Sequence, residues 1–204
     1  MKKKYWLILL VIIIIGIIAF IFYKNSFKNL KIGNNKNSQE IVDYILNTSS
    51  YEAQVTVNVT SNKNNNKYIL KQTYQNPDKS TQEVIEPSNI EGIKIENDGE
   101  KIKIENSRLN LNTILENYNY LGDNSLDLHS FIEDYRKDDK ATSEETEKEI
   151  IMKARNHIEN IYIQNKTLYI DKQTLKPIKM EIKDNKQKTT IYILYNEVKV
   201  NSTK

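Results

Sequence analysis

The stretch YEAQVTVNVT, residues 51–60, decides the fold because its polar and apolar side chains alternate strictly. Successive side chains of an extended strand point to opposite faces of a sheet. One face of this stretch therefore carries Ala53, Val55, Val57 and Val59, and the other carries Glu52, Gln54, Thr56 and Asn58. Such alternation predicts a β-strand with one buried face and one face in water.

Similar stretches occur on both sides of this one. NKNNN, residues 62–66, predicts a turn, and KYILKQTYQ, residues 67–75, predicts the returning strand. The C-terminal third adds EIIMKAR, KTLYID, PIKMEIKD and KTTIYILYNEVKV. Many short alternating strands joined by short connections predict an antiparallel meander with one apolar face.

The stretch QEVIEPSNIEGIKIENDGEKIKIEN, residues 82–106, carries seven carboxylates and raises the question of an acidic active site. Ile93 and Ile95, and then Ile102 and Ile104, alternate with lysines and glutamates around the turn residue Gly99. Cross-strand Lys–Glu pairing on a wet face explains this pattern. We therefore favour a hairpin, and keep a wall hydrolase acting through these carboxylates as a minor alternative.

Three helices are expected to cover the apolar face. NSQEIVDYILNTSS, residues 37–50, begins with Asn37 and has Glu40 three residues later, as in a capping box. Apolar residues at helical spacing predict two more helices over residues 111–118 and 128–135. The charged run at residues 136–149 predicts a mobile loop. The expected fold class is α+β, a curved antiparallel sheet packed over about three helices.

Residues 1–23 predict an N-terminal transmembrane anchor. Three lysines precede the uncharged segment from Trp6 to Tyr23, whose only glycine is Gly16. A helix of this length spans about 27 Å, close to the hydrocarbon thickness of a bilayer. A cleaved signal peptide is the alternative, but no small-residue cleavage site follows the segment. The predicted organisation is an anchor at 1–23, a linker at 24–37 and an extracytoplasmic domain at 38–204 of a bacterial cytoplasmic membrane protein.

Charge and composition exclude several function classes. The formal net charge of +3 equals the contribution of the three lysines at positions 2–4, so the remainder is neutral and unsuited to binding nucleic acid. The absence of cysteine excludes disulfides and thiolate chemistry. His129 and His157 fit no metal or catalytic motif and are expected at the surface. We therefore expect no catalytic residue, no metal and no cofactor.

Tyrosine is the most distinctive residue for binding, with thirteen in the chain. Tyr51, Tyr68 and Tyr74 are expected on the apolar face of the sheet. Tyrosine is common both in sheet cores and at protein interfaces. Core packing and a face for a partner or ligand are therefore both open for these three residues.

The order of these elements resembles the LolA-like superfamily of half-barrel proteins, and within it the clostridial spore-germination lipoprotein family of GerS. The resemblance rests on YEAQVTVNV, on KQTYQNPDKSTQEVIEPSNIEGIKIENDG and on LYIDKQTLKPIKMEI, and it covers roughly residues 38–200. It implies a non-enzymatic protein outside the cytoplasmic membrane. In the GerS family the partner is a cell-wall hydrolase, an N-acetylmuramoyl-L-alanine amidase of spore cortex, and in LolA-type carriers the ligand is a lipoprotein.

Two functions follow as expectations from this resemblance. The first is a membrane-anchored regulator that binds and activates a wall amidase during sporulation or germination. The alternative is a tethered lipid or lipoprotein binder. GerS-like lipoproteins carry a lipid-modified cysteine, whereas this chain has none, and the predicted anchor would replace that lipid.

Overall fold

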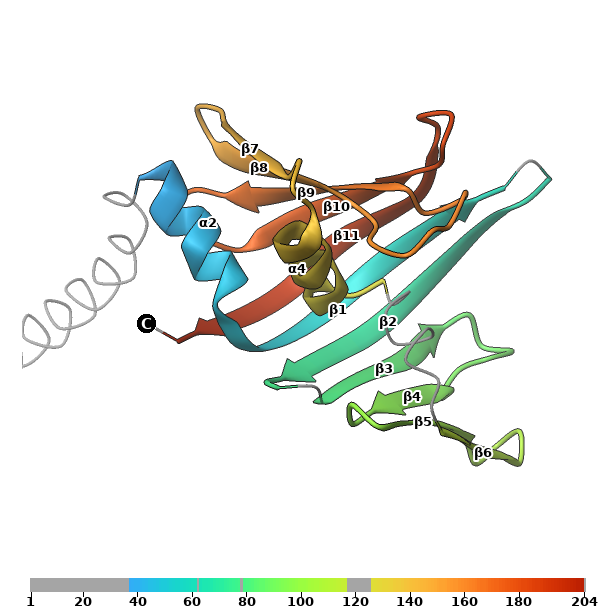
Figure 1. Ribbon diagram of the computed structural model, residues 1–204. Helices are drawn as coiled ribbons and strands as arrows, with labels where there is room; N and C mark the ends of the chain where they lie inside the picture. The colour runs from blue at the N-terminus through green and yellow to red at the C-terminus, as the bar shows by residue number, and fades with distance from the viewer. Residues whose placement is uncertain (1–36, 62, 78, 117–125, 204) are drawn as a thin grey trace, which may run out of the picture. The chain divides into compact units, whose positions relative to one another are not determined.

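The strand predicted at residues 51–60 lies in the middle of a large antiparallel sheet in the computed structural model (Figure 1), which describes residues 37–61, 63–77, 79–116 and 126–203. The sheet has eleven strands in the order β6-β5-β4-β3-β2-β1-β11-β10-β9-β8-β7. The strands are β1 (Thr48–Thr60), β2 (Asn65–Gln75), β3 (Lys79–Glu86), β4 (Lys94–Asn97), β5 (Lys101–Asn106), β6 (Leu111–Glu116), β7 (Thr142–Glu145), β8 (Glu149–Arg155), β9 (Asn165–Asp171), β10 (Pro177–Lys183) and β11 (Thr189–Ser202). All pairings are antiparallel.

The pairing of β1 with β11 joins the two ends of the domain. Every other neighbouring pair in the sheet is consecutive in sequence, whereas β1 and β11 are the first and last strands. The register of β1 and β11 is regular from Val57↔Ile193 to Val55↔Tyr195. It shifts by one residue between Val55 and Gln54. The long β1 therefore carries β2 on one side and β11 on the other.

Two helices lie on one side of this sheet (Figure 1): α2 (Ser38–Leu46) and α4 (Leu128–Lys137). The capping box predicted for α2 is present, because the Asn37 side chain accepts from Glu40 N at 2.9 Å and the Glu40 side chain accepts from Asn37 N at 3.2 Å. Asp127 caps α4 by accepting from Ser130 N at 2.8 Å. Such caps satisfy backbone donors that the first helical turn leaves free.

The hydrophobic core lies between these helices and the strands β1, β2 and β8–β11. The alternation that predicts β1 is confirmed, since Ala53, Val55 and Val57 are all buried. The helices contribute Ile41, Val42, Ile45, Leu128, Phe131 and Ile132 to the same core. Burying such side chains stabilises the fold by about 1.5–3 kcal/mol each.

The expected α+β class is confirmed, with a mainly antiparallel sheet and two helices in the described part of the chain. The helix predicted over residues 111–118 is wrong: its described part is strand β6, which pairs with β5. The loop predicted over 136–149 is also wrong in part, because β7 pairs with β8 inside it. The expected number of about three covering helices is therefore reduced to two among the described residues.

The predicted membrane anchor, with Trp6, Gly16 and Tyr23, lies outside the described residues. Among the residues that are described, no helix combines the length and apolar character that a membrane crossing requires.

Candidate partner-binding surface

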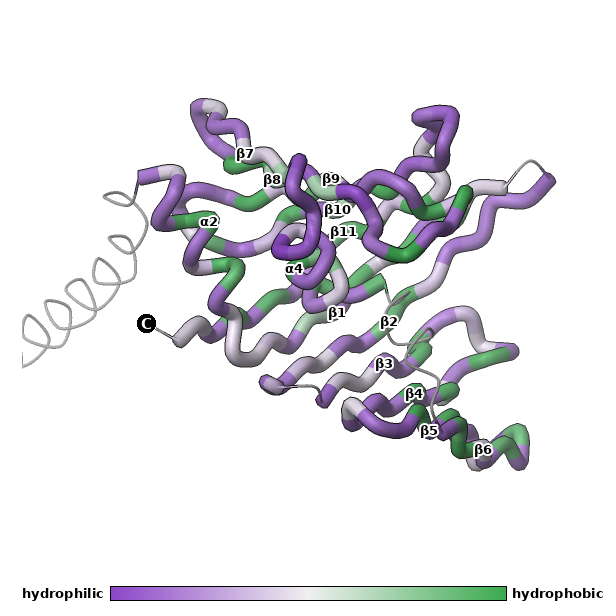
Figure 2. The backbone as a smooth tube through the Cα atoms, in the orientation of Figure 1, coloured by the Kyte–Doolittle hydropathy of each residue, from purple (hydrophilic) through white to green (hydrophobic). Residues whose placement is uncertain are grey.

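The two described helices cover the apolar face of the sheet over only part of its width. Directly paired residues lie on the same side of a sheet, so the register extends the core face outward from β1. One such row runs from Ala53 through Gln72 and Gln82 to Ile95 and Ile104. Apolar positions continue into β5 and β6, at the end of the sheet far from α2 (Figure 2).

We call the part of this side that no described helix covers the open face. It includes five core-side apolar residues of β2 to β6 that keep accessible surface, namely Leu70, Val84, Ile95, Ile104 and Leu115, whereas Ile102 on the same side is only 6% exposed. Ile95 is 39% exposed, and the other four are partly buried. By contrast, core positions on β1 such as Val55 are fully buried. The open face is therefore an apolar surface that a partner could cover.

The three tyrosines do lie on one side of the sheet, as expected from the sequence. Tyr51 pairs directly with Tyr74, and Tyr68 pairs with the core residue Val57. Tyr51 and Tyr74 are 3% and 5% exposed, while Tyr68 is partly buried. Their role as a face for a partner or ligand stays a prediction, and Tyr68 is the member with accessible surface.

Tyr51 and Tyr74 also position the start of α4. The Tyr51 hydroxyl accepts a hydrogen bond from Leu128 N at 3.2 Å, and the Tyr74 hydroxyl donates to Pro77 O at 2.9 Å. The Tyr74 ring stacks on His129 with centroids 4.1 Å apart. His129 is thus part of an aromatic stack rather than the isolated surface histidine expected from the sequence.

Two buried polar atoms on the core side of the sheet have no hydrogen-bond partner among the described residues. Gln72 is fully buried; its amide nitrogen donates to Leu126 O at 3.4 Å, and its Oε1 has no hydrogen-bond partner. The hydroxyl of Tyr195 is buried and also lacks a partner. Burial, with a smaller contribution from the nearby Asp127 carboxylate, raises the pKa of Tyr195 well above its usual value. Both atoms are buried, so they are unsatisfied groups inside the fold rather than groups presented to a partner.

The strand carboxylates Glu83, Glu96 and Glu105 belong to the polar side of the sheet, as expected, whereas Glu91, Asp98 and Glu100 lie in the turns between strands. Lys94 lies opposite Glu105, and Glu96 lies opposite Lys103, across the β4–β5 pair. Lys103 forms ion pairs with both Glu96 and Glu105. Its hydrogen bond lowers the pKa of Glu105. A general acid needs a raised carboxyl pKa, so this pairing gives no support to hydrolytic chemistry here.

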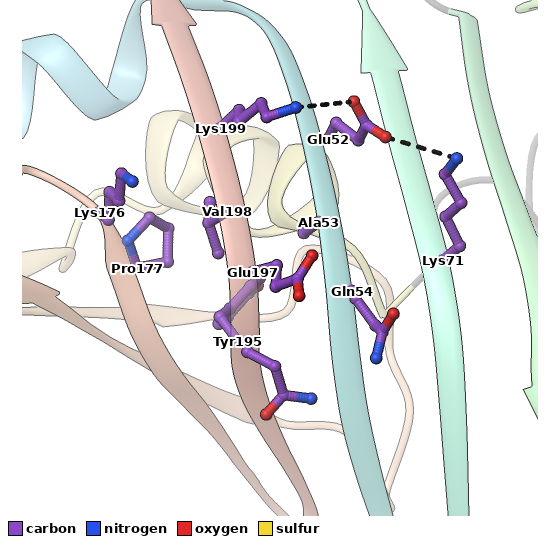
Figure 3. A pocket seen from close by; sticks show the side chains of 11 residues that line it. Glu52, Ala53, Gln54, Lys71, Lys176, Pro177, Tyr195, Glu197, Val198 and Lys199 are labelled. Atoms are coloured by element: carbon purple, nitrogen blue, oxygen red, sulfur yellow. Dashed lines mark ion pairs between the residues drawn. The ribbon is translucent and has the colours of Figure 1, made fainter.

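A groove of about 530 Å³ crosses the polar side between β1, β2 and β11 (Figure 3). Glu52 lies between two lysines in this groove, with its carboxylate oxygens 3.4 Å from Lys71 Nζ and 4.0 Å from Lys199 Nζ. Ala53, Tyr195 and Val198 also line the groove. These charges satisfy one another at the surface, and the groove contains no nucleophile paired with a base.

A buried polar cluster holds α4 against the sheet. We call it the Asp134 cluster; its members are Asp134, Lys166, His157 and Ser130. Lys166 Nζ lies 2.5 Å from Asp134 Oδ2 and donates to Ser130 Oγ at 2.8 Å. The backbone N–H of His157 donates to Asp134 Oδ1 at 2.9 Å, and its ring Nδ1 contacts the same oxygen.

The Asp134 cluster combines a serine and a lysine, but it is better suited to structure than to catalysis. Asp134 and Lys166 are 0% and 1% exposed, so a substrate has no access to them. No sequence pattern predicts that residues of α4, of β9 and of the loop around His157 meet in one cluster. Among the described residues, no three His, Asp or Glu side chains are grouped as metal ligands.

In the part of the chain that the structure describes, an open antiparallel sheet carries two helices on one side. The family model for YdcC-like sporulation proteins matches residues 2–203, and the chain belongs to this family. No protein with curated annotation matches the sequence.

Solved structures support the resemblance to GerS. The structure of the CwlD amidase from Clostridioides difficile in complex with the GerS lipoprotein contains a similar chain, with 25% identity and a TM-score of 0.51 over 78% of this chain and 91% of that one. An uncharacterized conserved protein from Thermus thermophilus shares the fold at 14% identity, with a TM-score of 0.53 over 83% and 90%. The LolA superfamily protein NE2245 from Nitrosomonas europaea is also similar, at 11% identity and a TM-score of 0.43 over 83% and 96%.

Proposed function

We propose that this protein is a non-enzymatic binding protein that holds and activates a cell-wall amidase during sporulation or germination. The observation that carries the proposal is the similarity to the structure in which GerS is bound to the CwlD amidase. Membership of a sporulation family gives the biological setting. The predicted anchor would place the domain outside the cytoplasmic membrane, at the cell wall where such an amidase acts.

The open face is the surface that we assign to the amidase. A binding surface of a stable complex is commonly an apolar centre with a polar rim. Ile95 lies in the middle of the open face and is 39% exposed. Lys94 and Glu96 flank it in sequence and point to the polar side of the sheet, so a partner covering Ile95 need not desolvate this ion pair.

The test compares two variants in which an apolar residue of similar exposed fraction is replaced by glutamate. Ile95→Glu places a charge in the open face, whereas Leu194→Glu places one on the polar side of β11, where Leu194 is 37% exposed and pairs with Thr56. The full chain is reconstituted in nanodiscs, and the affinity for an N-acetylmuramoyl-L-alanine amidase of the same organism is measured by interferometry. Peptidoglycan cleavage by that amidase is measured with and without the protein.

We expect Ile95→Glu to weaken binding by at least about tenfold, because a buried charge at an apolar centre is unpaired. Leu194→Glu should bind as the unmodified chain does. Failure of the unmodified chain to bind or activate the amidase would refute the proposed function. Binding that Ile95→Glu leaves intact would refute only the assignment of the open face.

A tethered lipid or lipoprotein binder is the second candidate, and the uncovered apolar residues of the open face favour it. This function requires the face to take acyl chains. Native mass spectrometry of the detergent-free nanodisc complex, followed by competition with a fluorescent fatty acid, tests it. A saturable probe signal that Ile95→Glu abolishes would favour this candidate, whereas no saturable signal would eliminate it.

A further inference from the structure

The two edges of the sheet differ in how they are protected. An exposed edge strand offers free backbone N–H and C=O groups to another strand, and proteins usually block such edges with charges or short strands. The edge strand β7 has only four residues, TSEE, and all are exposed. Its Glu144 pairs with Lys153 at 2.6 Å, and its Glu145 pairs with Lys172. The β7 edge therefore has the usual protection.

The described residues give the opposite edge, β6, less protection of this kind. Its sequence is LNTILE, and its one charge, Glu116, is paired with Lys101 at 3.1 Å. Ile114 is 59% exposed on the polar side of the strand. In the described part of the chain, β5 is the only strand that pairs with β6. Among the described residues, the outer side of β6 is thus a strand edge with apolar side chains, and it is suited to pairing.

The sequence of β6 is complementary to itself. Leu111, Thr113 and Leu115 lie on the side of the open face, because they pair with Asn106, Ile104 and Ile102 of β5. If two copies pair antiparallel with Thr113 opposite Thr113, then Leu111 of each copy lies opposite Leu115 of the other. In this register, the open-face side chains of one copy lie opposite the open-face side chains of the other, as antiparallel pairing requires.

We propose that β6 is a self-association edge, at which two copies of this chain join their sheets with Thr113 at the two-fold axis. The pairing covers the partly buried Leu111 and Leu115 with each other. On the polar side it brings the two Ile114 side chains into diagonal contact, which long side chains can span. No charge faces a like charge across the five paired positions, 111–115. A second copy of β6 provides apolar residues opposite Leu111 and Leu115 without any further requirement. A strand of another protein would need apolar residues at the same spacing.

This pairing joins the open faces of the two copies into one continuous surface. A two-fold axis perpendicular to the sheet keeps corresponding faces on the same side. Backbone N–H and C=O groups make the hydrogen bonds between the two β6 strands and so provide the affinity. The side chains at 111–115 determine which residues of the two strands lie opposite each other. The proposal does not depend on the function proposed above, since no amidase takes part in it.

Cysteine cross-linking tests the proposal in the full chain, because the natural sequence has no cysteine. A single Thr113→Cys lies opposite itself, whereas Ser143→Cys lies on the exposed, charged β7 edge and serves as the matched control. Both variants are reconstituted in vesicles and oxidised with copper phenanthroline, and dimer formation is followed on non-reducing gels. A mixture of Asn112→Cys and Ile114→Cys chains tests the register, because these two positions lie opposite each other.

We expect Thr113→Cys to form dimers about tenfold faster than Ser143→Cys, because a disulfide requires closely opposed Cβ atoms. The Asn112→Cys and Ile114→Cys mixture should give mainly the mixed dimer. Adding Ile114→Lys to Thr113→Cys should reduce its rate to that of the control, since it places two like charges near each other; circular dichroism checks that this variant is folded.

Equal rates for Thr113→Cys and Ser143→Cys would overturn the proposal. Cross-linking of Thr113→Cys to a different protein in native membranes, without self-dimers, would also overturn it and would assign the edge to a heterologous strand. A rate that Ile114→Lys leaves unchanged would show that cross-linking arises from random collision rather than from strand pairing.

Discussion

At the scale of single residues, the buried ion pair between Lys166 and Asp134 is the feature with the largest expected effect on stability. Lys166→Met keeps most of the volume but leaves the Asp134 carboxylate buried without its cation. Removing one partner of a buried pair costs about 3–5 kcal/mol. We expect the free energy of unfolding, measured by urea titration, to fall by about this amount.

The exposed pair between Lys103 and Glu105 gives the control for that prediction. The side chains of Lys103 and Glu105 are 39% and 35% exposed. Exposed pairs contribute about 0–1 kcal/mol, so Lys103→Met should lower stability only slightly. Combining Lys166→Met with Asp134→Leu should recover much of the lost stability, since neither charge is then buried alone. Equal small losses for Lys166→Met and Lys103→Met would contradict the structural role of the Asp134 cluster.

Asp138 gives the protein a defined sensitivity to acid. The side chain accepts hydrogen bonds from the backbone N–H, Nε and Nη2 of Arg155 and from Lys140 N, and its pKa falls to about 2, chiefly because of Arg155. A carboxyl whose pKa is lower in the folded state stabilises the fold above the unfolded pKa of 3.8, and this contribution is lost as the pH falls through 2.

The measurement is urea unfolding of the unmodified chain and Asp138→Asn from pH 6 to pH 2. The unmodified chain should be more stable at pH 6, and the difference between the two should shrink by about 2 kcal/mol toward pH 2. Parallel stability curves over this window would show that Asp138 does not titrate with the lowered pKa.

At the scale of elements, the start of α4 depends on a buried cap. Asp127 is 2% exposed and accepts from Ser130 N, and the same turn places Leu128 N against the Tyr51 hydroxyl. Asp127→Ala should therefore cost about 1–2 kcal/mol in urea unfolding. Asn37→Ala, which removes the exposed cap of α2, is the comparison and should cost about 0.5–1 kcal/mol. The opposite ranking would show that burial adds nothing to the α4 cap.

The elements also show what the sequence could and could not predict. Strict alternation predicts β1 and the β4–β5 hairpin correctly because one face of each is apolar and the other meets water. Strand β6 was predicted as a helix because Leu111, Ile114 and Leu115 also fit a helical spacing. The turn at residues 107–110 returns the chain onto β5, with Asn110 at φ +53° and the Asn106 side chain accepting from Leu109 N at 3.0 Å. The turn at residues 107–110 therefore explains why residues 111–116 form a strand, although their apolar spacing also fits a helix.

Strand β7 was missed for a different reason. Both of its faces are exposed, so its sequence has no alternation to detect, and its two glutamates resemble a solvated loop. The strand forms because β8 offers a free edge and because Lys153 and Lys172 neutralise the glutamates. The Asp134 cluster was likewise undetectable, since its residues come from three elements that only the complete sheet brings together. The open face was predictable as an apolar surface, but the sequence did not predict that no described helix would cover it.

At the scale of the whole molecule, stability should be distributed unevenly across the sheet. The core is concentrated on β1, β2 and β8–β11, whereas Ile102 and Asn106 are the only buried residues described in β4, β5 and β6. Local opening is easiest where few apolar contacts hold a segment. Hydrogen exchange followed by mass spectrometry should therefore show faster exchange in peptides covering residues 94–116 than in those covering residues 51–59 and 189–195.

The same measurement links the fold to both proposals. An amidase on the open face should increase protection of β4, including Ile95, while pairing of two copies should increase protection of β6 as the protein concentration rises. Protection of β6 that depends on concentration without any amidase would support self-association, and protection of β4 that appears only with the amidase would support partner binding. If residues 94–116 exchange as slowly as β1 in the free monomer, this half of the sheet is stable without a partner, and the open face loses its physical reason to bind one.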